Sequence, residues 1–491
     1  MSRWLTRMAI GMMSGMALSA WLGAEAVVAA LLVMVAGVIG LSLFPDRTKI
    51  LLSIASVAAL WAGLFLYAHE YGQWQTLPET IEFTGPVEVI GRGEVKVFYR
   101  PMTLRPTAEG WTGGDILYRA PVDFSGVPGE QHVFSCTLKR PENFELGFDY
   151  RSLLASRGTG YVCERGGQSS ELSSEGFSLR TLLYHVQSGF RLRIAALIPE
   201  PEAGLLSGLL IGGSDTLAPE TKAAFARAGL SHIVAVSGYN MSVVAEGLVI
   251  FALIIGFWRR FAVVAAVIGL AFFLLVIDGS AASLRAALMA WLAFGAYFAG
   301  RPSASWNGLL VAGVVMLCVN PLLIRYDVGF QLSFLATLAL LTFARSFETF
   351  DFFRHWYGKG AALLLTTVVI ELFTLPVILS TFGTVSVIAP LANAIVLPLV
   401  PLAMFVGITA VAVVALLPGL GYLFTPLVWL PLAAIIRLAE AMAGVSWASL
   451  SPSSEGLDRG AVYAVLWYAG LGLAVYGLER IRKRYVLGMD H

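Results

Sequence analysis

The sequence predicts a polytopic α-helical membrane protein with a small β domain inserted on its extracytoplasmic side. The 491 residues are 57% hydrophobic and only 13% charged, whereas an ordinary soluble domain is about one quarter charged. Apolar runs near the length that crosses about 30 Å of hydrocarbon recur along most of the chain. A more polar stretch with alternating hydrophobicity, residues 69–177, separates an early group of these runs from a later one.

Overall composition excludes several other classes of protein. The 33 basic and 32 acidic residues nearly cancel, so net charge gives no argument for a nucleic-acid or acidic partner. Three cysteines and six histidines are too few for a disulfide-dense secreted module or a cysteine-rich zinc protein. We expect no metal ion, no cofactor and no catalysis, and a binding function has to be argued from local patterns.

Residues 1–68 are expected to form three transmembrane helices, at Met8–Trp21, Val27–Phe44 and Leu51–Ala68. Basic residues precede the first run and follow the second, and such residues accumulate on the cytoplasmic side of membranes. The N-terminus is therefore predicted in the cytoplasm, and three crossings place residue 69 outside. A cleaved signal peptide is disfavoured because no clear cleavage site precedes Glu25 and further apolar runs follow at once.

The segment 69–177 is predicted to be a small β domain, with strands in stretches such as Val87–Tyr99 and His132–Leu138. This topology places Cys136 and Cys163 outside the reducing cytosol, so a disulfide between them is favoured over two separately buried thiols. The chain-entropy model gives such a bond roughly 3 kcal/mol of stabilisation. The third cysteine, Cys318, lies in a later apolar run and would behave there as a small hydrophobic residue.

The later apolar part, residues 231–478, is predicted to be a transmembrane helical bundle, which follows an amphipathic and helical bridging segment, residues 178–230. Its candidate spans are Ile233–Phe257, Phe261–Ile277, Ala282–Ala299, Gly308–Val319, Val328–Phe343, Ala361–Leu379, Val385–Leu417, Gly421–Met442 and Ala461–Tyr476. Basic loops fall where an alternating topology puts cytoplasm, and residues 479–491 form a basic cytoplasmic tail. The chain is expected outside after Leu379 and inside at its end, which requires an odd number of crossings. One piece, Val385–Val396, is therefore predicted to be re-entrant.

Polar residues within the apolar part are the best functional clues, because such side chains usually face a bundle interior or a water-filled path. The first cluster contains His232, Ser237 and Asn240. A helix capped by Ser231 would bring Ser237 and Asn240 onto neighbouring positions, whereas the Ser237-Gly238 pair would instead open the backbone. Hydrogen-bonded packing at a helix start explains His232 equally well. Nucleophilic catalysis by Ser237 is disfavoured, since no carboxylate follows at a recognisable spacing.

Two further clusters lie later in the bundle. Arg285 is two turns inside its helix, so Asp278, Glu246 or a polar substrate should accompany the guanidinium. An internal salt bridge and a polar lining are both open for this residue. Gln331 and Ser333 form the third cluster, in which the amide serves either as a link between helices or as part of a lining.

These stretches resemble the ComEC family of competence membrane proteins. The resemblance rests on Gly208–Gly212, Ala228–Gly238, Ser283–Met289, Pro321 with Gly329–Phe334, Leu375-Pro376 with Phe382-Gly383, and Ala392-Asn393 before Pro398. In the β domain, Pro141–Phe144 and Phe148–Tyr150 resemble the family's OB-like domain. The family motif has a histidine after Ser-Gly-Leu, whereas this chain has Tyr239-Asn240 at that place, so the role of that histidine is not transferred.

The resemblance implies a channel in the cytoplasmic (inner) membrane that passes one strand of DNA inward during natural transformation, with both termini in the cytoplasm. It also implies a DNA-receptor protein outside and an ATP-driven translocase inside. Many members carry a C-terminal metallo-β-lactamase-like domain, which we do not expect here because the chain stops soon after Arg484 and its histidines are scattered. A separate nuclease would then act in trans.

The candidate contacts with single-stranded DNA fall into two sets. The channel-lining or DNA-contacting set is His232, Ser237, Asn240, Arg285, Gln331 and Ser333, and the OB-like domain supplies Arg92, Lys96, Arg100, Lys139, Arg140 and Arg151. Basic groups that follow phosphates and aromatic rings that stack on bases are the usual requirements for such binding. The rings available in the β domain are Phe98, Tyr99, Tyr118, Phe134, Phe144 and Tyr150. Solvated charges on an ordinary β surface would explain the same residues.

Two other functions compete with the channel. A secondary transporter of a small anionic solute would use a broken helix at Ser237-Gly238 and the re-entrant segment near the membrane centre. Inverted-repeat symmetry would favour it, and the hydropathy pattern shows none. The other is a structural scaffold that depends on a separate partner. Membrane lipid is a further expected partner of the channel.

Overall fold

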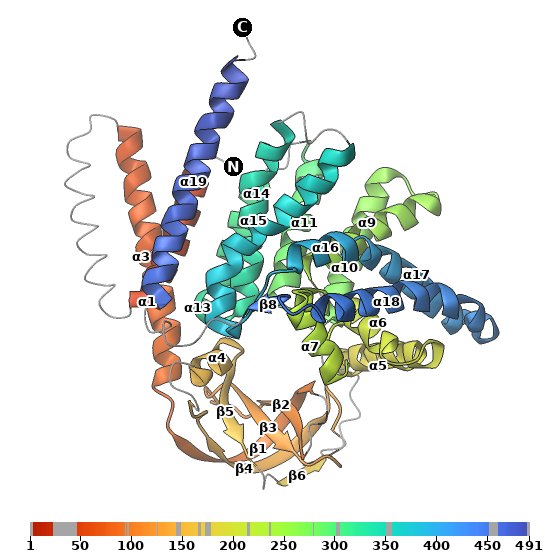
Figure 1. The fold of residues 1–491 in the computed structure, drawn as a ribbon. Helices are drawn as coiled ribbons and strands as arrows, with labels where there is room; N and C mark the ends of the chain where they lie inside the picture. The colour runs from red at the N-terminus through yellow and green to blue at the C-terminus, as the bar shows by residue number, and fades with distance from the viewer. Residues whose placement is uncertain are drawn as a thin grey trace. The chain divides into compact units, whose positions relative to one another are not determined.

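The computed structural model describes residues 3–22, 47–93, 95, 98–124, 126–143, 149–164, 168–171, 178–213, 217–234, 237–277, 279–300, 305–349, 356–450 and 460–488 (Figure 1). The expected span Val27–Phe44, and the side chains of Lys96, Phe144 and Asp278, lie outside these residues. The chain divides into two compact units, one formed by Met1–Ser188 with Leu310–Asp327 and the other by Gly189–Leu309 with Val328–His491.

Two long helices open the first unit, α1 (Arg3–Leu22) and α3 (Arg47–Gln75). They contain the expected spans Met8–Trp21 and Leu51–Ala68, and they pack closely against one another. Met16 and Ala20 on α1 and Leu64 on α3 are almost fully buried. The apolar runs therefore form helices as expected.

A six-stranded sheet follows in the first unit. It contains β1 (Thr80–Arg92), β2 (Arg100–Pro106), β3 (Asp115–Ala120), β4 (Gln131–Lys139), β5 (Thr159–Cys163) and β6 (Gln168–Glu171), with helix α4 (Tyr150–Ser156) before β5. The strand order is β1-β2-β3-β5-β4-β6, and β1 also pairs with β4. This last pairing closes five strands into an OB-like barrel in which β3 and β5 run parallel. The expected strand His132–Leu138 is confirmed, whereas the one at Val87–Tyr99 ends at Arg92.

Alternation of side chains along the strands builds the core of the barrel. Residues of β1 and β4 that point inward, such as Val87, Val89 and Leu138, are completely buried. Tyr118 and Phe134 lie in the same core with 2% and 0% exposure, and their rings pack edge to face at 4.9 Å. Their expected role as base-stacking surfaces is therefore wrong, because no base can reach a ring inside the barrel.

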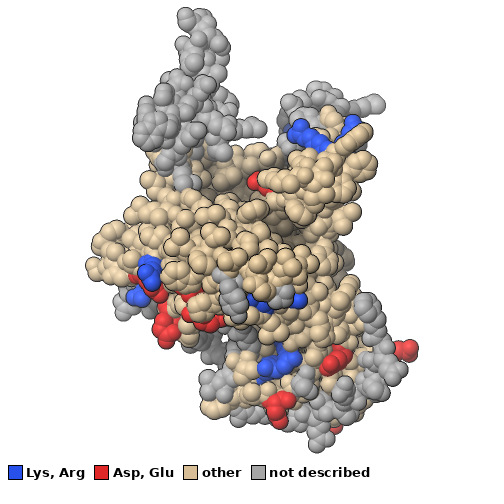
Figure 2. Space-filling view, turned by 90° about the vertical axis from the view of Figure 1, so that its right-hand side faces the viewer, with Lys and Arg blue, Asp and Glu red and all other residues tan. Residues whose placement is uncertain are grey.

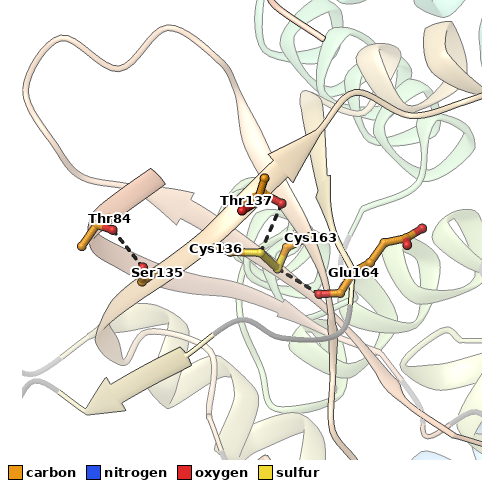
Figure 3. Close-up of a disulfide and its surroundings, with 6 residues drawn as sticks. All are labelled: Thr84, Ser135, Cys136, Thr137, Cys163 and Glu164. Atoms are coloured by element: carbon orange, nitrogen blue, oxygen red, sulfur yellow. Dashed lines mark hydrogen bonds between the residues drawn. A yellow bond between two sulfur atoms is a disulfide. The ribbon is translucent and has the colours of Figure 1, made fainter. Parts of the chain in front are cut away.

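A disulfide joins Cys136 of β4 to Cys163 of β5, as expected (Figure 3). Beside it, the hydroxyl groups of Thr84 and Ser135 form a hydrogen bond of 2.9 Å between β1 and β4. The covalent bond and the strand pairing thus hold the same side of the barrel together. Cys318, on α12 (Ser305–Val319), remains a free thiol and is exposed.

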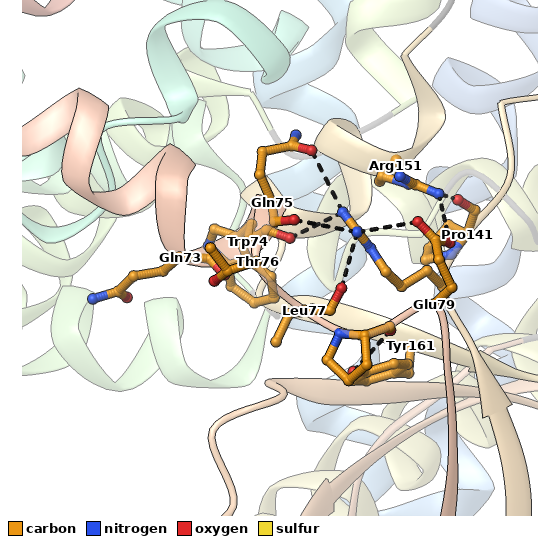
Figure 4. Close-up of polar contacts among 11 residues, drawn as sticks. Gln73, Trp74, Gln75, Thr76, Leu77, Glu79, Pro141, Arg151 and Tyr161 are labelled. Carbon is orange, nitrogen blue, oxygen red and sulfur yellow. Dashed lines mark hydrogen bonds and ion pairs between the residues drawn. The ribbon is translucent and has the colours of Figure 1, made fainter.

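Arg140 fastens the barrel to the end of α3. Figure 4 labels its partners Trp74, Gln75, Leu77 and Glu79. The Arg140 guanidinium donates to the backbone carbonyls of Trp74, Gln75 and Leu77 at 3.1, 3.3 and 3.0 Å, and to a Glu79 carboxylate oxygen at 3.3 Å. The last carbonyl groups of a helix have no partner within the helix, and a cation near them is stabilising. The Arg140 side chain is only 5% exposed, so it completes the end of α3 from within the fold.

The segment Leu310–Asp327 belongs to this first unit although it lies far along the chain. The Asn320 side-chain amide donates to the Ser156 carbonyl at the end of α4, at 2.7 Å. Arg325, in the short helix α13 (Leu323–Tyr326), donates to the Ala20 carbonyl at the end of α1. These bonds connect the segment both to the barrel and to the N-terminal helices.

The second unit is a helical bundle, and α5 (Leu179–Leu197) leads into it from the first. Its helices are α6 (Glu202–Leu210), α7 (Pro219–Arg227), α8 (Ser231–Val234), α9 (Gly238–Ile254), α10 (Arg259–Val276), α11 (Ala281–Phe298), α14 (Val328–Thr349), α15 (Trp356–Phe382), α16 (Ala389–Val396), α17 (Leu399–Leu416), α18 (Gly421–Ala443) and α19 (Gly460–Gly488), with a short 3-10 turn, Pro418–Leu420, and a two-stranded ladder of β7 (Val385–Ser386) with β8 (Ser449–Leu450). Helix α6 is buried along its whole length, so it forms the centre of the largest apolar core.

Within the described part of the chain, five helices are long and apolar enough to cross a membrane: Arg259–Val276, Ala281–Phe298, Leu364–Phe382, Leu399–Leu416 and Leu423–Ala443. Shorter apolar helices occur at Gly238–Ile254, Ser305–Val319, Val328–Phe343 and Leu466–Gly477. Figure 2 shows broad uncharged surface, on which the acidic and basic side chains gather in small groups. The chain is therefore a polytopic membrane protein.

Two of the expected spans are interrupted. The stretch Ile233–Phe257 does not form one helix, since α8 ends at Val234 and α9 begins at Gly238. Ser237 caps α9, so the alternative in which the Ser-Gly pair opens the backbone is the one observed. The stretch Val385–Leu417 is divided into β7, α16 and α17, and Pro398 stands at the start of α17. Whether α16 is re-entrant stays a prediction.

Removing the disulfide should weaken the barrel. We expect Cys136→Ser with Cys163→Ser to lower the free energy of unfolding of the barrel by about 3 kcal/mol, because the unfolded chain regains the entropy of the open loop. Pulse proteolysis of the purified protein in increasing urea measures this difference. Cys318→Ser is the control and should leave the midpoint unchanged, and equal midpoints for all three proteins would contradict the expectation.

Arg140 offers a second test of the fold. Arg140→Ala should destabilise the barrel by at least about 2 kcal/mol, since several buried carbonyl groups lose a charged donor at once. The neighbouring Lys139 is exposed, so Lys139→Ala provides a matched loss of charge without a loss of buried contacts. The same proteolysis measurement should separate the two variants, and similar midpoints would show that the Arg140 contacts contribute little.

Candidate functional site

Arg285 lies in the first half of α11, among helices that are otherwise apolar. The helix begins after Ser280, whose hydroxyl accepts the backbone N–H of Ser283 at 3.2 Å. Ser283 and Ala287 on the same helix are completely buried. Small residues around Arg285 allow α9 to approach α11 closely, and this approach decides what the guanidinium can touch.

The Arg285 guanidinium joins three of the motif stretches identified in the sequence. Its Nε donates to the Ser333 hydroxyl of α14 at 2.7 Å, and its Nη1 lies 3.4 Å from the Met289 sulfur. Its Nη2 sits against Gly238, the first residue of α9, where an added Cβ would lie only 2.8 Å away. A larger residue at this position would therefore have to displace the guanidinium. The starts of α9 and α14, each about 50 residues from Arg285 along the chain, thus meet at this one cation.

No carboxylate of the described residues lies within salt-bridge distance of this guanidinium. Glu246, one of the partners expected from the sequence, is exposed on α9, and Asp278 lies outside the described residues. Among the described residues, the hydrogen-bond partners of this guanidinium are a hydroxyl group and a thioether, which carry no charge. They engage two of its five N–H donors, one on Nε and one on Nη1.

Asn240 lies close to this group in sequence but is oriented into the helix packing. The Ser237 hydroxyl caps α9 by accepting the Asn240 N–H at 3.4 Å and donates to the Asn240 side-chain oxygen at 3.1 Å. The Asn240 amide donates to the Leu209 carbonyl of α6 at 3.3 Å, and the residue is 1% exposed. These surroundings favour a role in packing over the expected role in a polar lining.

The remaining polar residues of the bundle are more scattered. His232 is exposed on the short helix α8. Gln331 is half-buried on α14, two residues before Ser333, and positions two apart on a helix do not share a face. Glu371 is half-buried on α15, and the buried side-chain oxygen of Asn393 on α16 has no hydrogen-bond partner among the residues that the structure describes. Among the motif residues with described contacts, Ser333, Met289 and Gly238 lie against Arg285.

A basic and aromatic surface lies where β1, β2 and β3 of the barrel meet. Arg92 donates to the Tyr184 hydroxyl at 3.2 Å, and Arg100 donates to the Phe124 carbonyl at 3.4 Å. Burial, and then the neighbouring charge of Arg92, lowers the pKa of Arg100. Phe98 lies between the end of β1 and the start of β2, and it is 71% exposed. We call Arg92, Phe98, Tyr99, Arg100, Arg119 and Tyr184 the barrel patch.

Two members of the barrel patch were missed by sequence reasoning. Arg119 on β3 stacks its guanidinium on the Tyr99 ring at 5.6 Å, and Tyr184 on α5 lies beneath Arg92 at 5.9 Å. Arg119 follows the buried Tyr118, so strand alternation alone places its side chain outside the barrel. Tyr184 had no such signal, because its place depends on how α5 docks against the strands.

Other basic residues of the barrel are engaged in the fold. Arg151 donates to the Pro141 carbonyl at 3.0 Å and to Glu79 at 3.1 Å, and Arg140 is buried against the end of α3. Arg105 forms two hydrogen bonds with Asp115, and these bonds raise the pKa of Arg105. The expected DNA contacts of Arg140 and Arg151 are therefore disfavoured, whereas Lys139 is exposed. Among the described residues, no group of three or more His, Cys, Asp or Glu side chains is arranged to hold a metal ion.

Comparison with known proteins adds to this geometry. Residues 209–480 match the competence protein family. ComE operon protein 3 of Bacillus subtilis (strain 168) is 25% identical over 307 residues, which cover 60% of this chain and 38% of that protein. No solved structure matches the chain. The matched family region spans more than half of the 491 residues and contains α9, α11 and α14, and the chain therefore belongs to the competence protein family, of the ComEC type.

Proposed function

We propose that the protein is the channel through which single-stranded DNA crosses the cytoplasmic membrane during natural transformation. The observation that carries the proposal is the position of Arg285, a cation without a carboxylate partner among the described residues, at the meeting point of α9, α11 and α14. Family membership supports the link to transformation. No catalytic step is proposed for this chain.

A guanidinium in this position is suited to a passing phosphate. A charged side chain among apolar helices costs roughly 2.5 to 3.5 kcal/mol unless it is compensated. Ser333 and Met289 supply only neutral contacts, so an anion that arrives would gain a charge-assisted hydrogen bond. Because each nucleotide brings one phosphate, the site would hold successive phosphates in turn and distinguish none of the bases.

The barrel patch would act before the strand enters the bundle. Arg92 and Arg100 present charges for phosphates, while the exposed Phe98 presents a ring for bases. Arg119 lies 3.5 Å from a Glu164 carboxylate oxygen and stacks on the Tyr99 ring, so it contributes less charge than the other two. Base stacking of this kind contributes about 1–3 kcal/mol per base and tolerates any sequence. In this arrangement the barrel lies outside the cytoplasmic membrane and both termini lie in the cytoplasm.

Three partners complete the proposed pathway. A receptor protein outside would deliver DNA, an ATP-driven translocase inside would pull the strand, and a separate nuclease would degrade its complement. The Arg285 site supports this division of work because a single cation with neutral neighbours binds and releases phosphate without chemistry. Directional movement then has to come from the partner that consumes ATP.

Arg285 provides the direct test. In a deletion strain complemented with this chain, Arg285→Ala should reduce transformation by at least about tenfold, which corresponds to losing about 1.4 kcal/mol of binding. Arg285→Lys should retain part of the activity, since it keeps the charge and loses the planar fork. Gly238→Ala should also impair uptake by displacing the guanidinium.

The control for this test is Arg259→Ala. Arg259 begins α10 and stacks on the Tyr297 ring at 5.7 Å, so its loss removes an arginine from the bundle without touching the Arg285 group. Membrane levels of all variants are compared by immunoblot. Normal transformation by Arg285→Ala at a normal membrane level would rule out the proposed contact.

The barrel patch is tested by salt dependence. For the purified full-length protein, Arg92→Ala or Arg100→Ala should lower the slope of log affinity for single-stranded DNA against log salt by about 0.7 per lost phosphate contact. Phe98→Ala should weaken binding by about 1–3 kcal/mol with an unchanged slope. Arg157→Ala, which removes an exposed arginine after α4, should match the unmodified protein. Unchanged slopes in both arginine variants would exclude the barrel patch as the binding surface.

A further inference from the structure

Helix α5 has its polar and apolar sides arranged unusually, since its polar side is used against the barrel. Arg180 forms an ion pair with Glu88 of β1 at 2.6 Å, and the Thr181 hydroxyl donates to the Pro128 carbonyl at 3.0 Å. Tyr184 on the next turn accepts from Arg92. The loop before β4 presses against the helix at Gly129, where a Cβ would collide with Thr181 and Ser178. The polar side of α5 is thus covered by protein.

The opposite side of α5 carries exposed leucines. Leu179, Leu182 and Leu192 are 55%, 44% and 72% exposed. At 3.6 residues per turn they fall within an arc of about 140°, which also contains Val186 and the exposed His185, whose ring hydrogen-bonds the Thr181 carbonyl of its own helix. Arg193 lies in the same arc and folds its side chain back over Gly189. In a protein surrounded only by water, this helix would turn its apolar side to the protein and its polar side to the solvent.

The far end of α5 is fixed to helices that cross the membrane. Ile194 and Leu197 are buried in one apolar core with residues of α17 and α18, and the Leu197 carbonyl accepts the Thr425 hydroxyl of α18 at 3.1 Å. Both of those helices carry large exposed apolar side chains, including Phe405 at 66% and Leu423 at 70%. Such side chains on a spanning helix face lipid, and the exposed Leu192 belongs to the same compact unit as these helices.

We propose that α5 lies in the interface of the outer leaflet, with Leu179, Leu182 and Leu192 in the boundary between headgroups and acyl chains. The polar side of its first turns keeps its contacts with the barrel. Arg193 would extend its guanidinium to the headgroups while its methylene groups remain among the leucines. Interfacial helices with leucine on one side and basic residues at its edge behave in this way.

The experiment measures how close this side of the helix comes to lipid. Single cysteines replace Leu182 or Leu192 in a full-length Cys318→Ser protein whose Cys136–Cys163 disulfide is intact. Each is labelled with a fluorophore, and the protein is reconstituted into vesicles of phosphatidylcholine and phosphatidylglycerol with or without a nitroxide near the headgroup end of the acyl chain. The control is Glu82→Cys, at an exposed position of β1.

We expect nitroxide lipid to reduce the fluorescence at positions 182 and 192 by about half or more, because interfacial helices sit about 5–10 Å into the boundary. The label at position 82 should keep its intensity. Equal intensities at all three positions would overturn the proposal. It would also be overturned if unlabelled Leu182→Cys formed disulfide-linked dimers in place of lipid quenching, since a second copy of the chain would then cover the leucines. Neither result depends on whether the protein transports DNA.

Discussion

Placing one positive charge among apolar helices is the constraint around which the bundle is organised. A guanidinium in this environment requires neighbours, and the structure supplies a hydroxyl from α14, a thioether from α11 and the bare backbone of α9. Each neighbour explains a local feature of the sequence. The break before α9 puts glycine at the contact, and Ser333 stands one turn inside α14. In the proposed function, this cation is the group that would bind a passing phosphate.

The barrel meets the opposite requirement, since it has to stay rigid while it presents charges to water. Its rigidity comes from the disulfide, from the closed strand pairing and from Arg140 at the end of α3. The basic residues of the barrel therefore fall into two kinds. Arg105, Arg140 and Arg151 are held by carboxylate or several carbonyl partners. In the barrel patch, Arg92 and Arg119 lie over aromatic rings, and Arg100 donates to one backbone carbonyl.

Much of this architecture follows from the sequence, because it depends on short-range patterns. Apolar length predicted the helices, alternation predicted β4, and topology with compartment predicted the Cys136–Cys163 bond. What the sequence did not reveal depends on contacts between distant segments. The sequence does not distinguish Arg140 from the other arginines of the barrel, because its carbonyl partners lie at the end of α3, about 65 residues earlier in the chain. Likewise, burial of Asn240 against Leu209 requires that α6 pass through the middle of the bundle.

The central claim, that DNA passes beside Arg285, is tested most directly by photo-crosslinking during uptake. A photoreactive amino acid at Met289, which touches Arg285, is compared with one at Ile268, which is 64% exposed on α10. Cells taking up labelled DNA are irradiated, and the protein is recovered under denaturing conditions. The account predicts labelled DNA attached at position 289 and none at position 268. Uptake that proceeds normally with no attachment at position 289 would contradict it.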